Sequence, residues 1–188
     1  MNMSVQLQKH FFTVDEYYLM AQGGVFAQDD RIELIEGEVI EMSPIGKRHA
    51  ACVRRLDRVL NHNASESAIV SVQAPISIGE FSEPQPDVAL LKPRADFYSN
   101  SHPTAEDVLL VIEVADTSVE YDRRVKLPLY ARAGIPEAWL VILPKDSIEA
   151  HCEPKDGKDQ KVQRLKRGKT IVSSSVAGLS VKVDDVLG

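Results

Sequence analysis

A nearly continuous apolar run, Val108–Val114 (VLLVIEV), limits what this chain can fold into more than any other feature. Runs of this kind form strands that are buried on both faces, which requires helices on either side of the sheet. Ala138–Leu143 (AWLVIL) is a second such run, and shorter strand-like runs cover residues 69–78 and 86–91. The pattern predicts an α/β fold with a mixed central sheet flanked by helices.

Local signals predict the other elements. Thr13 and Glu16 have the spacing of a capping box, and Glu36 and Gly37 separate two short alternating runs as a hairpin turn does. Pro128, inside a helical pattern, indicates a late helix start or a kink. The expected elements are helices over 13–22, 47–62 and 121–134, an N-terminal hairpin over 31–42, and C-terminal β-hairpins with turns at 155–157 and 167–168.

The composition is that of a single globular domain over residues 1–188, because 44% of the residues are hydrophobic and 27% are charged. No apolar run approaches the ~20 residues of a membrane span, and residues 1–12 lack the pattern of a signal peptide. We therefore expect a cytoplasmic protein with no membrane partner. Cys52 and Cys152 form no CxxC motif, so we expect two buried thiols and no zinc or redox motif.

Basic and acidic residues are segregated along the chain, whose net charge is −6. Residues 47–62 carry five basic residues against one acidic residue, and residues 145–170 carry eight against five. This distribution suits a protein that binds phosphate with one surface and holds carboxylates around a metal at another. Solvated helix faces and a charged hairpin would produce the same pattern.

Glu113 needs an explanation, because an ionised carboxylate in an apolar strand costs several kcal/mol unless a metal ion, a lysine or a proton compensates it. Asp87 opens the preceding strand, and adjacent strands would bring the two carboxylates within reach of one ion. The backbone carbonyl of Val114 could add a ligand, and such oxygen ligands suit Mg²⁺. Alternatively, Glu113 pairs with an arginine at a strand end, and Asp87 belongs to an ordinary Pro-Asp turn.

If this metal site hydrolyses phosphodiesters, as a nuclease does, it also needs a lysine near the attacking water. Ala115, two residues after Glu113 on the same strand face, cannot serve, so Lys126 in the following helix is the candidate. The spacing of Asp122 and Lys126 equally fits a surface ion pair between them.

The remaining polar and aromatic residues give weaker signals. Gln73 could orient a water or a base, whereas Tyr130 and Trp139 are interpreted as core residues. The other histidines are interpreted as surface residues: His10, His62, His102 and His151. No nucleophile elbow, Cys/His pairing or glycine-rich phosphate loop is present in the sequence.

Five blocks, RIELIEGEV, His49, PQPDVALL, VIEVADTS and YDRRVKLPLYARAGIPEAWLV, together resemble the Uma-two family of restriction-endonuclease-like proteins. The resemblance spans residues 11–187 and implies a branch of the PD-(D/E)xK nuclease superfamily. The implied fold is a restriction-endonuclease-like mixed sheet between helices that holds Mg²⁺. The resemblance makes Asp87 and Glu113 metal ligands, and it makes Lys126 a family lysine that lies on the helix instead of the strand.

The resemblance implies roles for two further residues. Glu33 falls in the ELIEGE block, where an accessory acidic residue is implied, and Glu38 is the competing choice. His49 matches a family histidine at the start of the basic helix, where it could bind a phosphate or pass a proton to the leaving oxygen. A histidine hydrogen-bonded to the helix backbone is the alternative.

We therefore expect a Mg²⁺-dependent endonuclease that hydrolyses DNA phosphodiesters, with Mn²⁺ as a substitute metal. Cleavage of both strands implies a homodimer. Four arginines of the basic helix would bind the DNA backbone: Arg48, Arg54, Arg55 and Arg58. Two other hypotheses stay open: a nuclease-like module that binds nucleic acid or a partner without cutting, and a metal-dependent hydrolase of another phosphate ester.

Overall fold

The protein, described from a computed structural model over residues 8–27 and 29–188, is built on a six-stranded mixed sheet. The strand order is β3-β4-β5-β6-β7-β8; β5 and β6 run parallel, and the other neighbours run antiparallel. The strands are β3 (Ile69–Val72), β4 (Val88–Leu91), β5 (Val108–Ala115), β6 (Glu137–Ile142), β7 (Ser147–Lys155) and β8 (Lys158–Lys166). The predicted mixed sheet is confirmed, and the two apolar runs form its middle strands.

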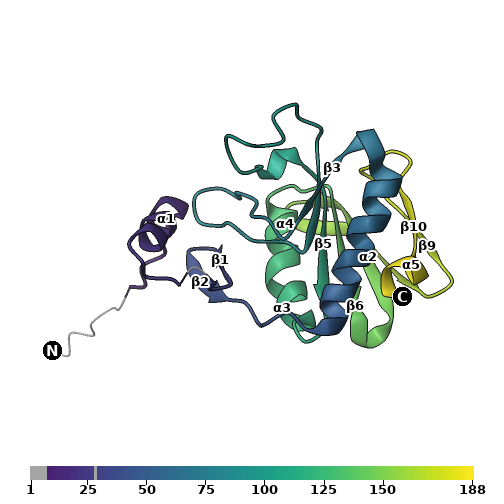
Figure 1. Cartoon of the computed structure of the whole chain (residues 1–188), viewed down its shortest axis with the longest axis horizontal. Coiled ribbons are helices and arrows are strands. Elements are labelled where there is room, and N and C mark those ends of the chain that lie inside the picture. Colours follow the sequence, from purple (N-terminus) through teal and green to yellow (C-terminus); the bar gives the residue numbers. More distant parts are fainter. Residues whose placement is uncertain (1–7, 28) are drawn as a thin grey trace.

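Helices cover both faces of the sheet, as two-sided burial of β5 requires. Figure 1 shows α2 (Lys47–Ala64) and the short α5 (Val183–Leu187) on one side, with α3 (Val119–Tyr121) and α4 (Leu127–Arg132) on the other. Side chains alternate along β5, so that Ile112 packs into the α2 core and Val111 into the α4 core. Glu113 has the parity of Val111, and its carboxylate therefore points toward the α3–α4 side.

The helix over 121–134 is interrupted, as Pro128 led us to expect. Between α3 and α4 lies a π-helical segment, η3 (Asp122–Lys126), in which the amide of Leu127 donates to the carbonyl of Asp122 five residues earlier. Pro128 lies in the first turn of α4, where its missing amide proton costs little. Wide π-turns of this kind are frequent at functional sites, and this one buries both Asp122 and Lys126.

The N-terminal elements match the prediction. Thr13 caps α1 (Val14–Gln22) in a complete capping box with Glu16, and β1 (Ile32–Ile35) pairs with β2 (Glu38–Glu41) as a separate hairpin.

Three 3₁₀ turns complete the helical elements: η1 (Ser65–Ser67), η2 (Ala105–Asp107) and η4 (Leu143–Lys145). Residues 1–12, which lack a signal-peptide pattern, lie mostly outside the described residues.

Two predicted segments are wrong in extent or pairing. The strand predicted over 69–78 ends at Val72, because Gln73 has a left-handed φ of 49° that takes the chain out of the sheet. The turn at 167–168 closes no hairpin: β9 (Thr170–Val172) pairs with β10 (Ser180–Lys182) and not with β8. The earlier hairpin, β7–β8, is an integral part of the central sheet, and α5 follows β10 without a clear sequence signal.

Cys52 and Cys152 are free and buried, as predicted. In the part of the chain that the structure describes, no helix has the length and apolarity needed to cross a membrane.

A buried carboxylate on β6 holds the loop after β9. Glu137 is 1% exposed, and its Oε2 accepts hydrogen bonds of 2.7–3.0 Å from the hydroxyls of Ser173, Ser174 and Ser175 and from the amides of Ser174 and Ser175. Its Oε1 accepts from the indole N–H of Trp139 at 2.6 Å. The carboxylate is therefore fully used as a structural acceptor.

Glu137→Gln should lower the free energy of unfolding by about 2–3 kcal/mol, because an amide cannot accept on both sides and leaves buried donors unpaired. Chemical denaturation would measure the loss. Glu153→Gln, an exposed substitution of the same kind on β7, is the matched control and should change stability by less than about 0.5 kcal/mol. Equal stabilities of the two variants would contradict the structural role of Glu137.

Candidate active site

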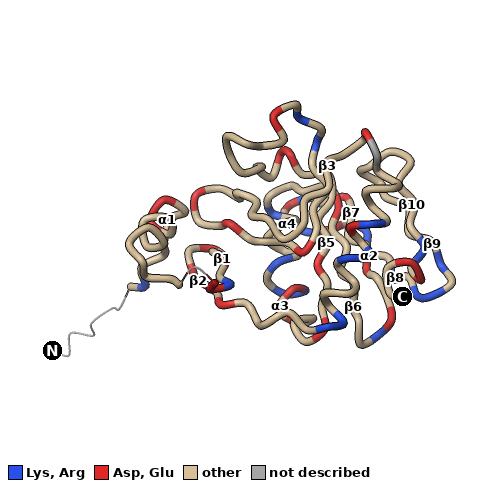
Figure 2. Tube along the Cα trace, in the orientation of Figure 1, with Lys and Arg blue, Asp and Glu red and all other residues tan. Residues whose placement is uncertain are grey.

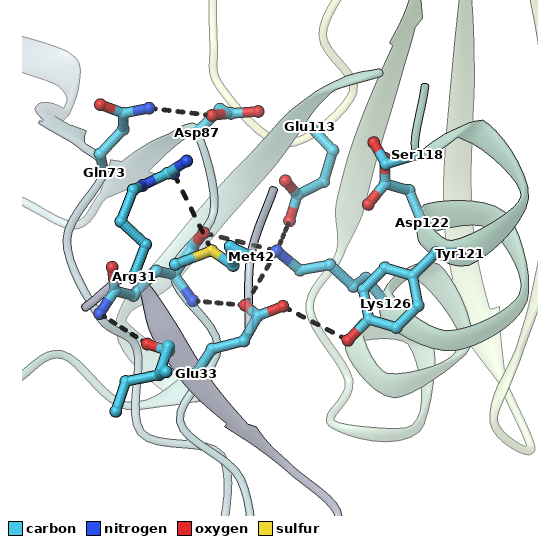
Figure 3. A network of polar contacts seen from close by, with 12 residues as sticks. Arg31, Glu33, Met42, Gln73, Asp87, Glu113, Ser118, Tyr121, Asp122 and Lys126 are labelled. Carbon is cyan, nitrogen blue, oxygen red and sulfur yellow. Dashed lines mark hydrogen bonds and ion pairs between the residues drawn. The ribbon is translucent and has the colours of Figure 1, made fainter. Parts of the chain in front are cut away.

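The residues predicted to act in catalysis or metal binding come together around one cavity of about 390 Å³, enclosed by the β1–β2 hairpin, the segment 42–46, the start of α2 and the ends of β4 and β5. Figure 3 shows several of its side chains pointing toward one another from these separate elements. Six of the residues assigned to catalysis or metal binding line the cavity: Glu33, His49, Asp87, Glu113, Val114 and Lys126.

Asp87 lies immediately before β4 and is held by three donors. Its Oδ2 is 2.9 Å from His49 Nε2 and accepts from the amide of Val114 at 2.9 Å, and its Oδ1 accepts from the Gln73 side chain at 3.2 Å. Burial alone would raise the pKa of Asp87, but the hydrogen bonds from His49, Val114 and Gln73 outweigh it and lower that pKa below its usual value. Asp87 is therefore a fixed, ionised carboxylate at the cavity wall.

His49 contacts a carboxylate: its Nε2 lies 2.9 Å from Asp87 Oδ2. Its Nδ1 is buried and has no hydrogen-bond partner among the described residues. Nε2 is therefore the ring nitrogen that donates to Asp87, because a proton on Nδ1 would be buried without an acceptor. The backbone-bonded alternative for this histidine is wrong, and its place is beside Asp87.

Glu113 is compensated by a lysine, one of the three solutions that the sequence allowed. Lys126 Nζ lies 2.8 Å from Glu113 Oε1 and 3.2 Å from Glu33 Oε2, and it also donates to the carbonyl of Gln85 at 3.4 Å (Figure 3). All three charged side chains are at most 3% exposed as residues. The arginine pairing considered for Glu113 is therefore wrong, because the cation comes from η3.

Burial and the neighbouring charges shift the pKa of both members of the Glu113–Lys126 pair. Burial raises the pKa of Glu113 to about 8, although the nearby ammonium of Lys126 opposes the shift. For Lys126, burial acts to lower the pKa, but the carboxylates of Glu113 and Glu33 outweigh it and raise the pKa above its usual value. Lys126 therefore remains an ammonium at neutral pH and is poorly suited to act as a base.

The structure distinguishes Glu33 from Glu38. Glu33, on β1, is buried; its Oε2 also accepts from the amide of Gln85 at 3.1 Å, and its Oε1 accepts from the Tyr121 hydroxyl at 3.4 Å. Glu38 is exposed and pairs with Lys9 at 3.3 Å. Of the two candidates, Glu33 is the one that lines the cavity.

Tyr130 was interpreted as a core residue, and the structure adds a polar contact to that role. It is 1% exposed, and its hydroxyl donates to Glu113 Oε1 at 2.6 Å. Burial and the neighbouring carboxylate of Glu113 raise the pKa of this hydroxyl well above its usual value, so it stays a donor. Its position four residues after Lys126 is the sequence signal that could have found it, because both side chains then lie on one helix face.

Two other predictions, one for the Asp122–Lys126 pair and one for His151, need correction. Asp122 and Lys126 form no surface pair; both are buried, and Asp122 accepts from the Ser118 hydroxyl at 2.7 Å. His151, predicted at the surface, is mostly buried between Glu149 and Asp159. Arg31, which no motif singled out, lines the cavity and donates to the carbonyl of Ser43 at 2.7 Å.

The four arginines of α2 lie outside the residues that line the cavity, within the described ranges. Arg54 and Arg58 are exposed, as predicted, and Arg48 is also exposed but lies 3.5 Å from Asp116, a cavity residue. Arg55 does not point freely outward: it donates to the carbonyls of Val186 and Leu187 at 2.9 and 2.7 Å. Figure 2, which colours the chain trace by charge, shows basic positions along α2 and near β9.

The donors available at the cavity suit a hard divalent cation. Glu113 Oε1 is occupied by two donors, whereas Oε2 has no hydrogen-bond partner in the described part of the chain. Among the described residues, no group of three or more His, Cys, Asp or Glu side chains could hold a metal. Two carboxylates supplemented by water and substrate oxygens fit Mg²⁺, whereas a protein zinc site needs three or four ligands.

A mixed sheet between helices, with the carboxylates of Asp87 and Glu113 and a buried lysine at one cavity, is the arrangement that the resemblance implies for a restriction-endonuclease-like protein. The chain belongs to the Uma2 family, described as "Putative restriction endonuclease", whose profile matches residues 14–184. It is therefore a member of a nuclease family, as the resemblance indicated.

One solved structure supports the same fold. It is the crystal structure of "a putative nuclease belonging to DUF820 from Anabaena variabilis", which is 16% identical, with a TM-score of 0.71 over 94% of this chain and 97% of that one. At this identity the likeness is evidence for the fold alone. Comparison with curated proteins finds no match.

Proposed function

We propose that this protein is a metal-dependent endonuclease that hydrolyses DNA phosphodiester bonds. The observation that carries the proposal is the convergence of Asp87, Glu113 and Lys126 on one cavity in a nuclease-family fold. The cavity collects an ionised carboxylate, a second carboxylate with an unused oxygen, and a buried ammonium. This is the set of charges that phosphodiester hydrolysis requires, because charge develops on the phosphate and an oxygen nucleophile must be activated.

In this proposal Asp87 and Glu113 hold Mg²⁺, with the carbonyl of Val114 as an additional ligand and Mn²⁺ as a substitute metal. When bound, the ion would supply Lewis-acid stabilisation of the phosphate and a water of lowered pKa. His49, Gln73 and the Val114 amide orient Asp87 through the hydrogen bonds described above. His49 then acts on the carboxylate and not on the leaving oxygen.

Lys126 contributes electrostatically. Because Glu113 and Glu33 hold its pKa high, its ammonium would stabilise negative charge on the reacting phosphate and position the attacking water by donating to it. Glu33 shares this ammonium at 3.2 Å and so helps to fix its position. A role as general base is therefore not part of the proposal for Lys126.

We also propose that exposed arginines of α2 form the surface that binds DNA. Arg54 and Arg58 are exposed on α2 and would contact DNA phosphates, whereas Arg55 is engaged with the C-terminal carbonyls. Binding through phosphates predicts a steep salt dependence. Cutting both strands of a two-fold symmetric duplex would require two copies of the site, hence a homodimer.

A second function is favoured by one observation. Lys126 already compensates Glu113 without a metal, so the same fold could bind nucleic acid or a partner without cutting it. Metal binding separates these functions poorly, because an inactive nuclease can retain its carboxylates. Turnover separates them.

Incubation with supercoiled plasmid tests the proposal. We expect nicking or linearisation in Mg²⁺ or Mn²⁺ and at least about 10²-fold less in EDTA, since the metal supplies several kcal/mol of charge stabilisation. Restoring Mg²⁺ in excess of the chelator should restore cutting, which controls for damage to the protein. If cutting is absent in every metal, the binding function is favoured.

A further inference from the structure

The two oxygens of the Glu113 carboxylate have different surroundings. Oε1 accepts a hydrogen bond from the Tyr130 hydroxyl at 2.6 Å and forms an ion pair with the Lys126 ammonium at 2.8 Å. Oε2 has no hydrogen-bond partner among the described residues, although Glu113 lines the cavity. Two donors on one oxygen fix the rotation of a carboxylate, because their directions determine where its plane lies. The second oxygen is thereby left for a ligand.

Tyr130 and Lys126 are one helical turn apart, so both donors come from the same side of η3 and α4. Their other contacts differ. Lys126 is shared with Glu33 and the Gln85 carbonyl, whereas the Tyr130 hydroxyl has Glu113 as its partner within the described chain. The ring of Tyr130 packs in the apolar core beside α4, and packing would be served equally by phenylalanine. Packing therefore does not explain why this residue carries a hydroxyl group.

We infer that Tyr130 is a positioning residue for the cation site: its hydroxyl holds Glu113 Oε1 and thereby presents Oε2 to a divalent cation. The inference rests on the proposed function, in which Glu113 is a metal ligand. Hydrogen-bond donors behind ligating carboxylates orient the ligand, and their removal typically weakens metal binding by about 10–100-fold. Tyr130 would act in this way from within the core, without touching the metal or the substrate.

Tyr130→Phe removes the hydroxyl and keeps the ring. Calorimetric titration with Mn²⁺ alone should give a Kd raised about tenfold or more relative to the wild-type protein. The Mg²⁺ concentration that half-saturates plasmid cleavage should rise similarly, while the rate at saturating Mg²⁺ falls only a few-fold. Tyr98→Phe is the matched control, because its hydroxyl donates to the Lys92 carbonyl at 2.9 Å, in the loop after β4 and outside the cavity lining.

A double-mutant cycle separates positioning from packing. In a Glu113→Gln background, adding Tyr130→Phe should weaken Mn²⁺ binding no further, whereas a packing effect would persist there. Thermal unfolding checks that the variants are folded. An unchanged Mn²⁺ Kd in folded Tyr130→Phe overturns the inference and leaves the proposed function standing. A wild-type protein that neither binds Mn²⁺ nor cuts DNA overturns both.

Discussion

Asp87→Asn is expected to lower the rate of metal-dependent DNA cleavage at least about a thousandfold while the protein remains folded. Asparagine keeps the size of the side chain and can still accept from the Val114 amide, so the hydrogen bond that ties it to β5 persists. It loses the charge that would hold the cation. A loss of about 4 kcal/mol of transition-state stabilisation corresponds to this factor at 1.36 kcal/mol per tenfold. Initial rates of plasmid nicking at saturating Mg²⁺ would measure it.

Asp185→Asn is the matched control for this variant. It makes the same change in charge at an exposed position of α5, outside the lining of the cavity, and should cut at the wild-type rate. Preparing the three proteins identically also tests for a contaminating nuclease, which would give equal cutting in all of them. Metal-dependent cutting by Asp87→Asn at the wild-type rate would rule out the proposed site.

The residues that sequence analysis placed in the site were those whose chemistry conflicts with their surroundings. Glu113 interrupts an apolar strand, and the energetic cost of that interruption predicted a compensating partner. Because side chains alternate along β5, Glu113 lies on the sheet face that is covered by α3 and α4. Asp87 was weaker as a signal, because Pro-Asp is common in turns, and its role became visible only through the contacts with His49, Gln73 and Val114.

The residues that were missed or misplaced have contacts set by tertiary structure. Tyr130 reads as core in any helical pattern, since the partner of its hydroxyl lies 17 residues earlier on a strand. Arg55 reads as an outward arginine, since periodicity cannot reveal that the chain returns to lay the carbonyls of α5 against it. The β9–β10 pair escaped prediction because its strands, of three residues each, are too short to show a clear alternating pattern.

The lysine beside Glu113 comes from the helical segment η3 and not from strand β5. A lysine two residues after Glu113 would have stood on the strand itself, but that position is Ala115. Lys126 reaches the same carboxylate from η3, where the π-turn buries it 2.8 Å from Glu113 Oε1. The spacing of the two groups along the chain differs from the strand-borne pattern, whereas the cavity still receives a lysine ammonium beside the Glu113 carboxylate.

Lys126→Met is expected to slow cleavage by about 10²–10³-fold, the range found when a single charge-stabilising donor is removed from an active site. Methionine fills a similar volume without the ammonium. Mn²⁺ binding should be retained, because Glu113 Oε1 would then be freed from the ammonium and both proposed carboxylate ligands would remain. Calorimetry with Mn²⁺ and cleavage rates at saturating Mg²⁺ would separate the two effects.

The same substitution should destabilise the metal-free protein by about 3 kcal/mol, because removing one member of a buried ion pair leaves its partners uncompensated. Part of this cost will be relieved by protonation of Glu113, whose pKa burial already raises to about 8. Added Mn²⁺ should therefore stabilise Lys126→Met more than it stabilises the wild-type protein. Lys161→Met, an exposed substitution on β8, controls for the lost charge and should alter neither rate nor stability appreciably. A Lys126→Met protein that cuts at the wild-type rate would contradict the electrostatic role assigned to this lysine.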